Sequence, residues 1–117
     1  MKKLDGQIAI ITGSGTGIGL AIAKKFLENG AKVLINDLNT QTFEYAKSIL
    51  IEAGIDPQNF AVFFSDVSNE TDVKNMFNEC ENKFGSATIL VNNAGIIQEK
   101  KFLNISNKDW DRMMLST

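Results

Sequence analysis

The sequence contains no histidine and only one cysteine, Cys80, among its 117 residues. The absence of histidine excludes an imidazole general base and a histidine-ligated metal site, so we expect no metal. A single cysteine cannot form a disulfide within the chain, and a lone thiol is typical of a reducing compartment. These absences predict a cytoplasmic protein.

Arginine and long apolar runs are also scarce. Arg112 is the only arginine, the lysines are spread along the chain, and the net charge is −2, whereas a nucleic-acid-binding surface needs clustered basic residues. Apolar runs such as 60–64 are far shorter than the ~20 residues that cross a bilayer. The sequence therefore predicts neither nucleic-acid nor membrane binding. Its 44% hydrophobic and 22% charged residues are ordinary for one globular domain.

Four short apolar segments alternate with amphipathic stretches. The apolar segments are 8–11, 33–35, 60–64 and 89–91, and the helical patterns are 18–29, 40–53, a stretch from a cap near Ser68 to Gly85, and one starting at Ser106. Segments without polar alternation are typical of strands buried on both faces. The alternation predicts an α/β fold of the Rossmann type. Its doubly wound parallel sheet would have the strand order 3-2-1-4, with helices on both faces.

The turn between the first strand and the first helix is rich in glycine. It reads Thr12-Gly13-Ser14-Gly15-Thr16-Gly17-Ile18-Gly19. Glycines let this backbone bend tightly and approach a pyrophosphate, and the helix N-terminus offers free N–H groups to phosphate. Gly19 would let helix and strand pack closely, and Ile18 would lie on the apolar face of the helix. The alternative is a glycine-rich turn without a ligand, but alternate glycines in this context favour dinucleotide binding.

Asp37 ends the second apolar segment. It follows the glycine turn by about 20 residues, the spacing at which a carboxylate accepts a hydrogen bond from a ribose 2′-OH. Its charge would repel a 2′-phosphate, and neither Thr16 nor Leu38 is basic, so NAD is favoured over NADP. The alternative is an exposed aspartate that caps the next helix.

Polar residues also follow the third and fourth segments, in Asp66-Val67 and Asn92-Asn93-Ala94-Gly95. A carboxylate at the first site can accept from an adenine amino group, whereas the alternative is a loop aspartate that leads into the cap at Ser68. Asparagine amides at the second site can tie loops to strand ends, and the small residues after them leave space for a bound ring. The alternative there is an ordinary polar strand exit.

Together these residues resemble the short-chain dehydrogenase/reductase family, in particular its 3-oxoacyl-carrier-protein reductases. The resemblance rests on the glycine turn, on the segments at 37, 66–67 and 92–95, and on 108–112, and it extends over essentially the whole chain. It implies a nicotinamide dinucleotide across the carboxyl ends of the strands, a homo-oligomer, and a carbonyl or alcohol substrate such as a 3-oxoacyl thioester, a sugar or another ketone. The candidate cofactor-binding residues are Gly13, Ser14, Thr16, Gly17, Ile18, Gly19, Asp37, Leu38, Asp66, Val67, Asn93, Ala94 and Gly95.

The Asn-Ser-Tyr-Lys tetrad of that family does not match any residues of this chain. Tyr45 is the only tyrosine, Ile49 stands where the family has lysine, and Thr117 stands where it has asparagine. We therefore expect no catalytic residue in residues 1–117, a single domain truncated at its C-terminal end, and hydride transfer only in a longer parent enzyme. Two alternatives stay open. The first is a non-catalytic protein that binds a nucleotide or a partner. The second is an S-adenosylmethionine-dependent methyltransferase, although that class does not account for the residues at 92–95.

Overall fold

The computed structural model describes residues 2–93. Its elements are β1 (Ile8–Thr12), α1 (Gly17–Glu28), β2 (Lys32–Asp37), α2 (Thr42–Glu52), a short 3₁₀ helix (Pro57–Asn59), β3 (Phe60–Phe64), α3 (Glu70–Lys83) and β4 (Ile89–Asn92). The strand order is β3-β2-β1-β4, and every neighbouring pair is parallel. The predicted fold class and strand order are confirmed. The helix expected from Ser106 lies outside the described residues.

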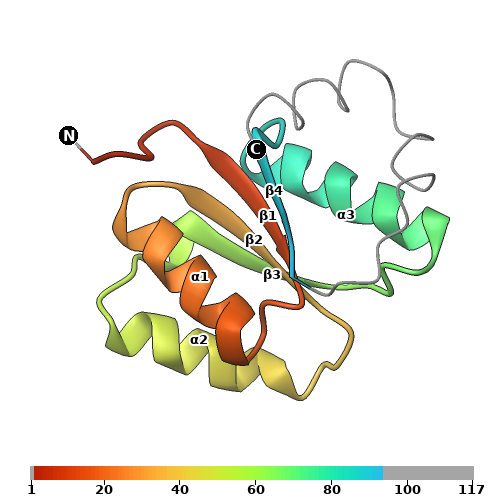
Figure 1. Cartoon of the computed structure of the whole chain (residues 1–117), viewed down its shortest axis with the longest axis horizontal. Coiled ribbons are helices and arrows are strands. Elements are labelled where there is room, and N and C mark those ends of the chain that lie inside the picture. Colours follow the sequence, from red (N-terminus) through yellow and green to blue (C-terminus); the bar gives the residue numbers. More distant parts are fainter. Residues whose placement is uncertain (1, 94–117) are drawn as a thin grey trace.

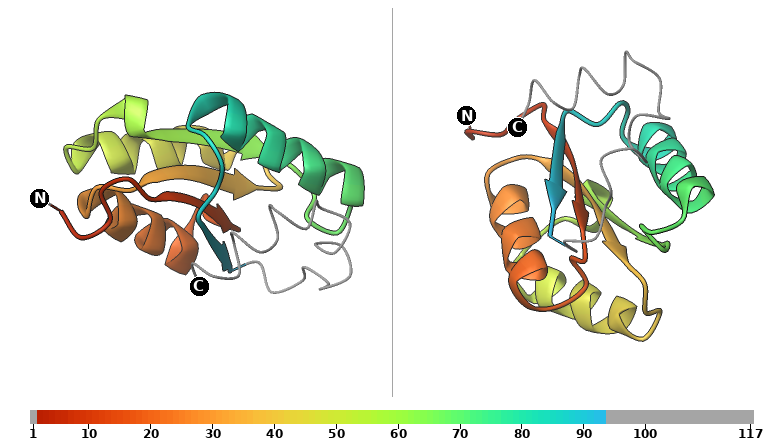
Figure 2. Two further views of the ribbon diagram at one scale, coloured as in Figure 1. Left: turned by 90° about the horizontal axis from the view of Figure 1, so that it is seen from above. Right: turned by 45° about the vertical axis from the view of Figure 1, so that its right-hand side comes forward.

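Helices cover both faces of the sheet, with α1 and α2 on one face and α3 on the other (Figures 1 and 2). Successive side chains of β1 point alternately to the two faces of the sheet and pack against the helices there. Ala9 and Ile11 pack in the cluster formed with α1 and α2, whereas Ile10 packs with Met76 and Cys80 of α3. Two buried faces explain why the strand segments are apolar without alternation.

The N-terminus of α3 differs from the prediction by one residue. Asn69, not Ser68, caps this helix, and its side-chain oxygen accepts a hydrogen bond from the N–H of Asp72 at 3.0 Å. The Ser68 hydroxyl instead donates to the Asp66 carboxylate at 2.6 Å. Two adjacent residues can each cap a helix, and the local turn decides between them.

The apolar face of α1 also differs from the prediction. Ile18 is 75% exposed, so it does not belong to the buried face. Leu20, Ala23 and Leu27 form that face together with Gly19. Ile18 is therefore a large apolar side chain on the surface beside the glycine turn.

The parallel strands place four chain segments at one end of the sheet. The glycine turn follows β1, Asp37 ends β2, Ser65 follows β3, and Asn93 follows β4. The candidate residues up to Asn93, separated in the sequence, are thereby gathered at the carboxyl ends of the strands, where ligands of open α/β sheets bind. Among the helices in the described part of the chain, none is long and apolar enough to cross a membrane.

Candidate functional site

The glycine turn uses two residues in the left-handed region of backbone space. Gly13 has φ +60° and Gly17 has φ +61°, conformations that favour glycine over residues with a Cβ. Thr16 is the N-cap of α1, and neither its side chain nor an acidic residue in the first turn caps the helix within the described residues. Among residues 2–93, therefore, no side-chain cap to the first N–H groups of α1 is seen, and uncapped N–H groups at a helix N-terminus can bind anions.

Gly19 allows the glycine turn, α1 and the exit of β4 to meet. A Cβ at this position would lie 2.8 Å from the Ser14 Cα and 2.7 Å from the Asn93 Nδ2, and would also collide with the Gly13 carbonyl oxygen. The Asn93 side chain donates a hydrogen bond to that same carbonyl at 3.1 Å. The close packing predicted for Gly19 is confirmed, and it involves β4 as well as the turn.

The Asp37 carboxylate lies against the glycine turn. Its Oδ2 accepts a hydrogen bond from the N–H of Gly15 at 3.0 Å, and its Oδ1 accepts from the N–H of Leu38 at 2.7 Å. In the described part of the chain no side chain caps α2, so the alternative role of Asp37 as a helix cap is not observed. A Cβ on Gly15 would collide with this carboxylate and with the Thr42 hydroxyl, so a larger residue there would displace these side chains.

Asp66 forms a local turn after β3. Its Oδ1 accepts hydrogen bonds from the backbone N–H of Ser68 at 2.9 Å and from the Ser68 hydroxyl, and its own N–H donates to Asp72 Oδ2 at 3.0 Å. This is the loop role given above as the alternative for Asp66. Val67 beside it is buried. Adenine recognition by Asp66 and Val67 stays a prediction.

Ser14 faces the protein interior. Its hydroxyl donates to the Ile11 carbonyl at 2.6 Å, and its N–H donates to the Asn36 carbonyl at 2.8 Å. The side chain is fully buried, so these contacts hold the turn onto β1 and β2. A cofactor contact at Ser14 stays a prediction.

The sequence does not predict Asn36 as a cofactor-binding residue. Its side chain nevertheless contacts two loops that contain predicted residues, the glycine turn and the segment after β3. The side chain is 2% exposed, and its Oδ1 accepts a hydrogen bond from the N–H of Gly13 at 3.3 Å. Its Nδ2 donates to the Ser65 hydroxyl at 2.7 Å and to the Ser65 carbonyl at 3.3 Å. The only signal in the sequence is a polar residue directly after the apolar stretch of β2.

The remaining candidates are placed as follows. Thr16 and Leu38 are exposed beside the turn, and Ala94 and Gly95 lie outside the described residues. Tyr45 lies on α2 and is exposed. Within residues 2–93, no cluster of histidine, cysteine or acidic side chains is arranged to hold a metal ion.

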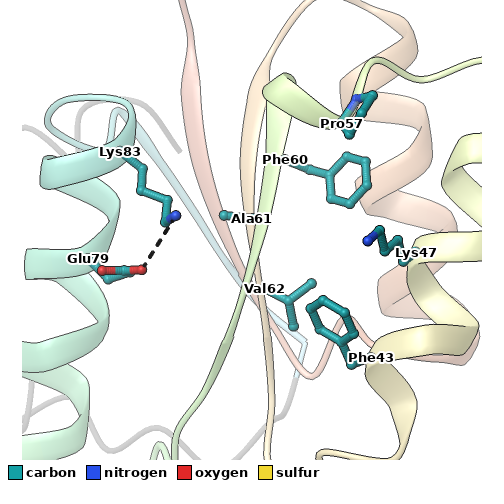
Figure 3. Close-up of a pocket in the computed structure, with 8 residues that line it drawn as sticks. All are labelled: Phe43, Lys47, Pro57, Phe60, Ala61, Val62, Glu79 and Lys83. Carbon is teal, nitrogen blue, oxygen red and sulfur yellow. Dashed lines mark ion pairs between the residues drawn. The ribbon is translucent and has the colours of Figure 1, made fainter.

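A cavity of about 300 Å³ lies elsewhere, across β3 between α2 and α3 (Figure 3). Its lining residues are Phe43, Lys47, Pro57, Phe60, Ala61, Val62, Glu79 and Lys83. Lys83 pairs with Glu79 at 3.9 Å on one side, and the Lys47 ammonium lies 5.7 Å from the Phe43 ring on the other. This cavity borders the amino-terminal half of β3 and contains none of the candidate cofactor-binding residues.

Comparison with known proteins identifies the family. The family model described as short chain dehydrogenase matches residues 7–116. The chain belongs to the short-chain dehydrogenase family. Members of the family with similar sequences include 3beta-hydroxysteroid dehydrogenase 2 of Eggerthella lenta, which is 41% identical over 114 residues. The NADP-dependent (R)-specific alcohol dehydrogenase of Lentilactobacillus kefiri is 40% identical over 113 residues.

The match covers 95% of this chain and 42% of the Eggerthella enzyme, and 96% of this chain and 43% of the Lentilactobacillus enzyme. This short-chain dehydrogenase sequence therefore spans about two fifths of the length of these curated relatives. A solved short-chain dehydrogenase/reductase of Burkholderia phymatum, in complex with NAD, has a TM-score of 0.67 and 30% identity, covering 77% of this chain and 31% of that one. None of these three is named as a 3-oxoacyl-carrier-protein reductase, so that closer resemblance stays a prediction.

Proposed function

We propose that this chain is the NAD(H)-binding part of a short-chain dehydrogenase that transfers hydride between nicotinamide and a small alcohol or carbonyl substrate. The observation that carries the proposal is the contact between the Asp37 carboxylate and the N–H of Gly15 at 3.0 Å. This contact joins a carboxylate suited to a ribose hydroxyl to the turn suited to a pyrophosphate.

Exposed apolar surface beside this contact supports the proposal. Ile18 and Leu38 are 75% and 69% exposed, and they flank the turn and Asp37 in the sequence. A bound dinucleotide that spans these segments would cover both side chains and remove their apolar surface from water.

The charge around Asp37 favours NAD over NADP. Segments 12–19 and 37–41 contain no lysine or arginine, so a 2′-phosphate beside Asp37 would meet a negative charge without a local counter-charge. The relatives divide on this point: the Lentilactobacillus enzyme is named NADP-dependent, whereas the Burkholderia structure holds NAD. The choice of NAD therefore depends on Asp37 in this chain.

Hydride transfer belongs to the parent protein in this proposal. When bound, the nicotinamide would supply hydride to a carbonyl or accept it from an alcohol, and the residues of this chain bind and orient the dinucleotide. The family resemblance supports a ketone or alcohol substrate and a homo-oligomer, and the single cysteine supports a cytoplasmic location. A non-catalytic nucleotide-binding protein is the second candidate, because the only tyrosine, Tyr45, is exposed on α2 and precedes Ile49 rather than lysine by one helical turn.

Binding of NADH, followed by its fluorescence, tests the proposal. Asp37→Ala should weaken NADH binding by about tenfold, because a hydrogen bond to a charged acceptor is lost. Asp56→Ala is the matched control, since Asp56 accepts from the N–H of Gln58 at 2.9 Å before β3, at the other end of the sheet. Absence of NADH binding, or equal affinity in the Asp37 variant, would contradict the proposal. Measurable hydride transfer by the parent protein would support the enzyme, and its absence would favour the non-catalytic nucleotide-binding protein.

A further inference from the structure

The carboxamide of Asn36 joins two segments that follow different strands. Its oxygen accepts from the N–H of Gly13 in the glycine turn, and its nitrogen donates to Ser65 at the exit of β3. Ser65 directly precedes the Asp66-Val67 segment. With both partners, Asn36 bridges loops that are far apart in the chain and adjacent at the carboxyl ends of the strands.

We propose that Asn36 is a positioning residue for the dinucleotide, which fixes the separation between the glycine turn and the segment after β3. The inference rests on the proposed function, in which the pyrophosphate lies on the turn and the adenine lies near residues 66–67. A ligand that touches both segments fits only one separation between them. A ligand that touches the β3 exit alone does not depend on that separation.

A carboxamide suits this role because it offers an acceptor and two donors in one plane. Alanine or leucine at position 36 would leave the N–H of Gly13 and the hydroxyl of Ser65 without this partner, and unpaired buried polar groups favour structures in which the segments move apart. Aspartate would keep the acceptor for Gly13 and lose the donors for Ser65.

The backbone of Asn36 supplies a separate attachment that survives substitution of the side chain. The N–H of Asn36 donates to the Ser14 hydroxyl at 3.1 Å, and the Asn36 carbonyl accepts from the N–H of Ser14 at 2.8 Å. The exit of β3 has a backbone attachment of its own, because the N–H of Ser65 donates to the Asp37 carbonyl at 3.1 Å. Asn36→Ala should therefore keep both segments on β2 while it removes the side-chain link between them. The variant therefore tests the link between the two segments while the attachment of the glycine turn to β2 stays intact.

Displacement of NADH by ADP-ribose and by adenosine tests the inference. ADP-ribose contacts both segments in the proposed binding mode, whereas adenosine contacts the end of β2 and the exit of β3 but not the pyrophosphate-binding turn. In Asn36→Ala the affinity for ADP-ribose should fall by about tenfold, and that for adenosine by less than about twofold, because one bridge of hydrogen bonds is lost. A merely structural role would lower the affinity for both ligands by the same factor.

Thr88→Val is the matched control. The Thr88 hydroxyl accepts from the N–H of Ile8 at 2.9 Å and donates to Gln7 at 2.9 Å, at the amino ends of the strands. Loss of this hydroxyl should lower the free energy of unfolding without changing the ratio of the affinities for ADP-ribose and adenosine. Ser65→Ala removes the 2.7 Å contact alone, so it should change the ratio in the same direction even if Asn36→Ala does not fold.

The outcomes distinguish the inference from the proposed function. If the unaltered chain binds neither NADH nor ADP-ribose, the proposed function fails, and the inference with it. If the unaltered chain binds both, but Asn36→Ala or Ser65→Ala leaves the ratio of ADP-ribose to adenosine affinity unchanged, only the inference about Asn36 is overturned. A selective loss for ADP-ribose in these variants, absent in Thr88→Val, supports it.

Discussion

Replacing Gly19 by alanine sets two effects of opposite sign against each other. Intrinsic helix propensity favours alanine over glycine by roughly 0.5–1 kcal/mol, so propensity alone predicts a more stable protein. The packing of α1 predicts the reverse, because a Cβ there would lie 2.8 Å from the Ser14 Cα and 2.7 Å from the Asn93 Nδ2 and would collide with the Gly13 carbonyl. Two of these three contacts are backbone atoms, which cannot rotate away.

The magnitudes decide in favour of packing. Forcing an extra methyl group into a filled site costs typically ~1–3 kcal/mol, and loss of the Asn93–Gly13 hydrogen bond adds about 1 kcal/mol. After the gain in propensity is subtracted, the net loss of unfolding free energy is about 1–3 kcal/mol. Such a loss would lower the melting temperature of a domain of this size by roughly 4 °C per kcal/mol.

Urea unfolding followed by circular dichroism measures this loss. Ala21→Gly, on the exposed side of the same helix, is the control for propensity and should cost about 1 kcal/mol. In an Asn93→Ala background, Gly19→Ala should cost less, because one of the three contacts is gone, but it should still destabilise the protein. A midpoint for Gly19→Ala equal to or above that of the unaltered chain would refute the packing argument.

Three further outcomes are expected. Asp37→Ser should narrow the preference for NADH over NADPH by about tenfold in a fluorescence titration, because the like charge is removed; an unchanged ratio would contradict the charge argument. Leu50→Ala should cost about 2–5 kcal/mol in urea unfolding, because Leu50 is fully buried, whereas Ile51→Ala, at a site 44% exposed, should cost much less; equal costs would contradict the described core. Burial, together with the charge of Glu81, raises the pKa of the Cys80 thiol to about 12. Below pH ~8.5, the usual thiol pKa, the neutral thiol contributes its full stability, which is lost as the pH rises toward 12. Alkylation at pH ~9 should therefore occur only as fast as the protein unfolds, and rapid reaction of the folded chain would contradict this.

The sequence predicts the layers of this fold well, because hydrophobic periodicity and glycine punctuation are local signals. The segment 60–64 coincides with β3, and the third helical pattern contains α3, whose residues Val73, Met76 and Cys80 are buried at helical spacing. Ends of elements are less well predicted. The helix expected over 40–53 spans Thr42–Glu52, because the side chain of Asn39 turns the chain first by accepting from the N–H of Gln41 at 2.8 Å.

The contacts within the candidate site depend on partners distant in the sequence. Gly15 and Asp37 could each be identified from spacing, but their hydrogen bond follows only once β1 and β2 pair. The role of Asn36 is not predictable from the sequence for the same reason, since its partners lie in the turn after β1 and at the exit of β3. Periodicity predicts Ile18 on the apolar face, but Ile18 lies in the first turn of α1 and is 75% exposed, whereas Ala23 and Leu27 further along the helix are buried.

Mapping of NADH binding on the backbone amides by NMR tests the central claim most directly. The claim predicts that NADH shifts the amide signals of Gly15, Leu38 and Val67, which lie after three different strands at one end of the sheet. Signals at the cavity across β3, such as those of Val62 and Lys83, should stay unchanged. Shifts confined to that cavity, or no shifts at saturating NADH, would contradict a dinucleotide site at the carboxyl ends of the strands.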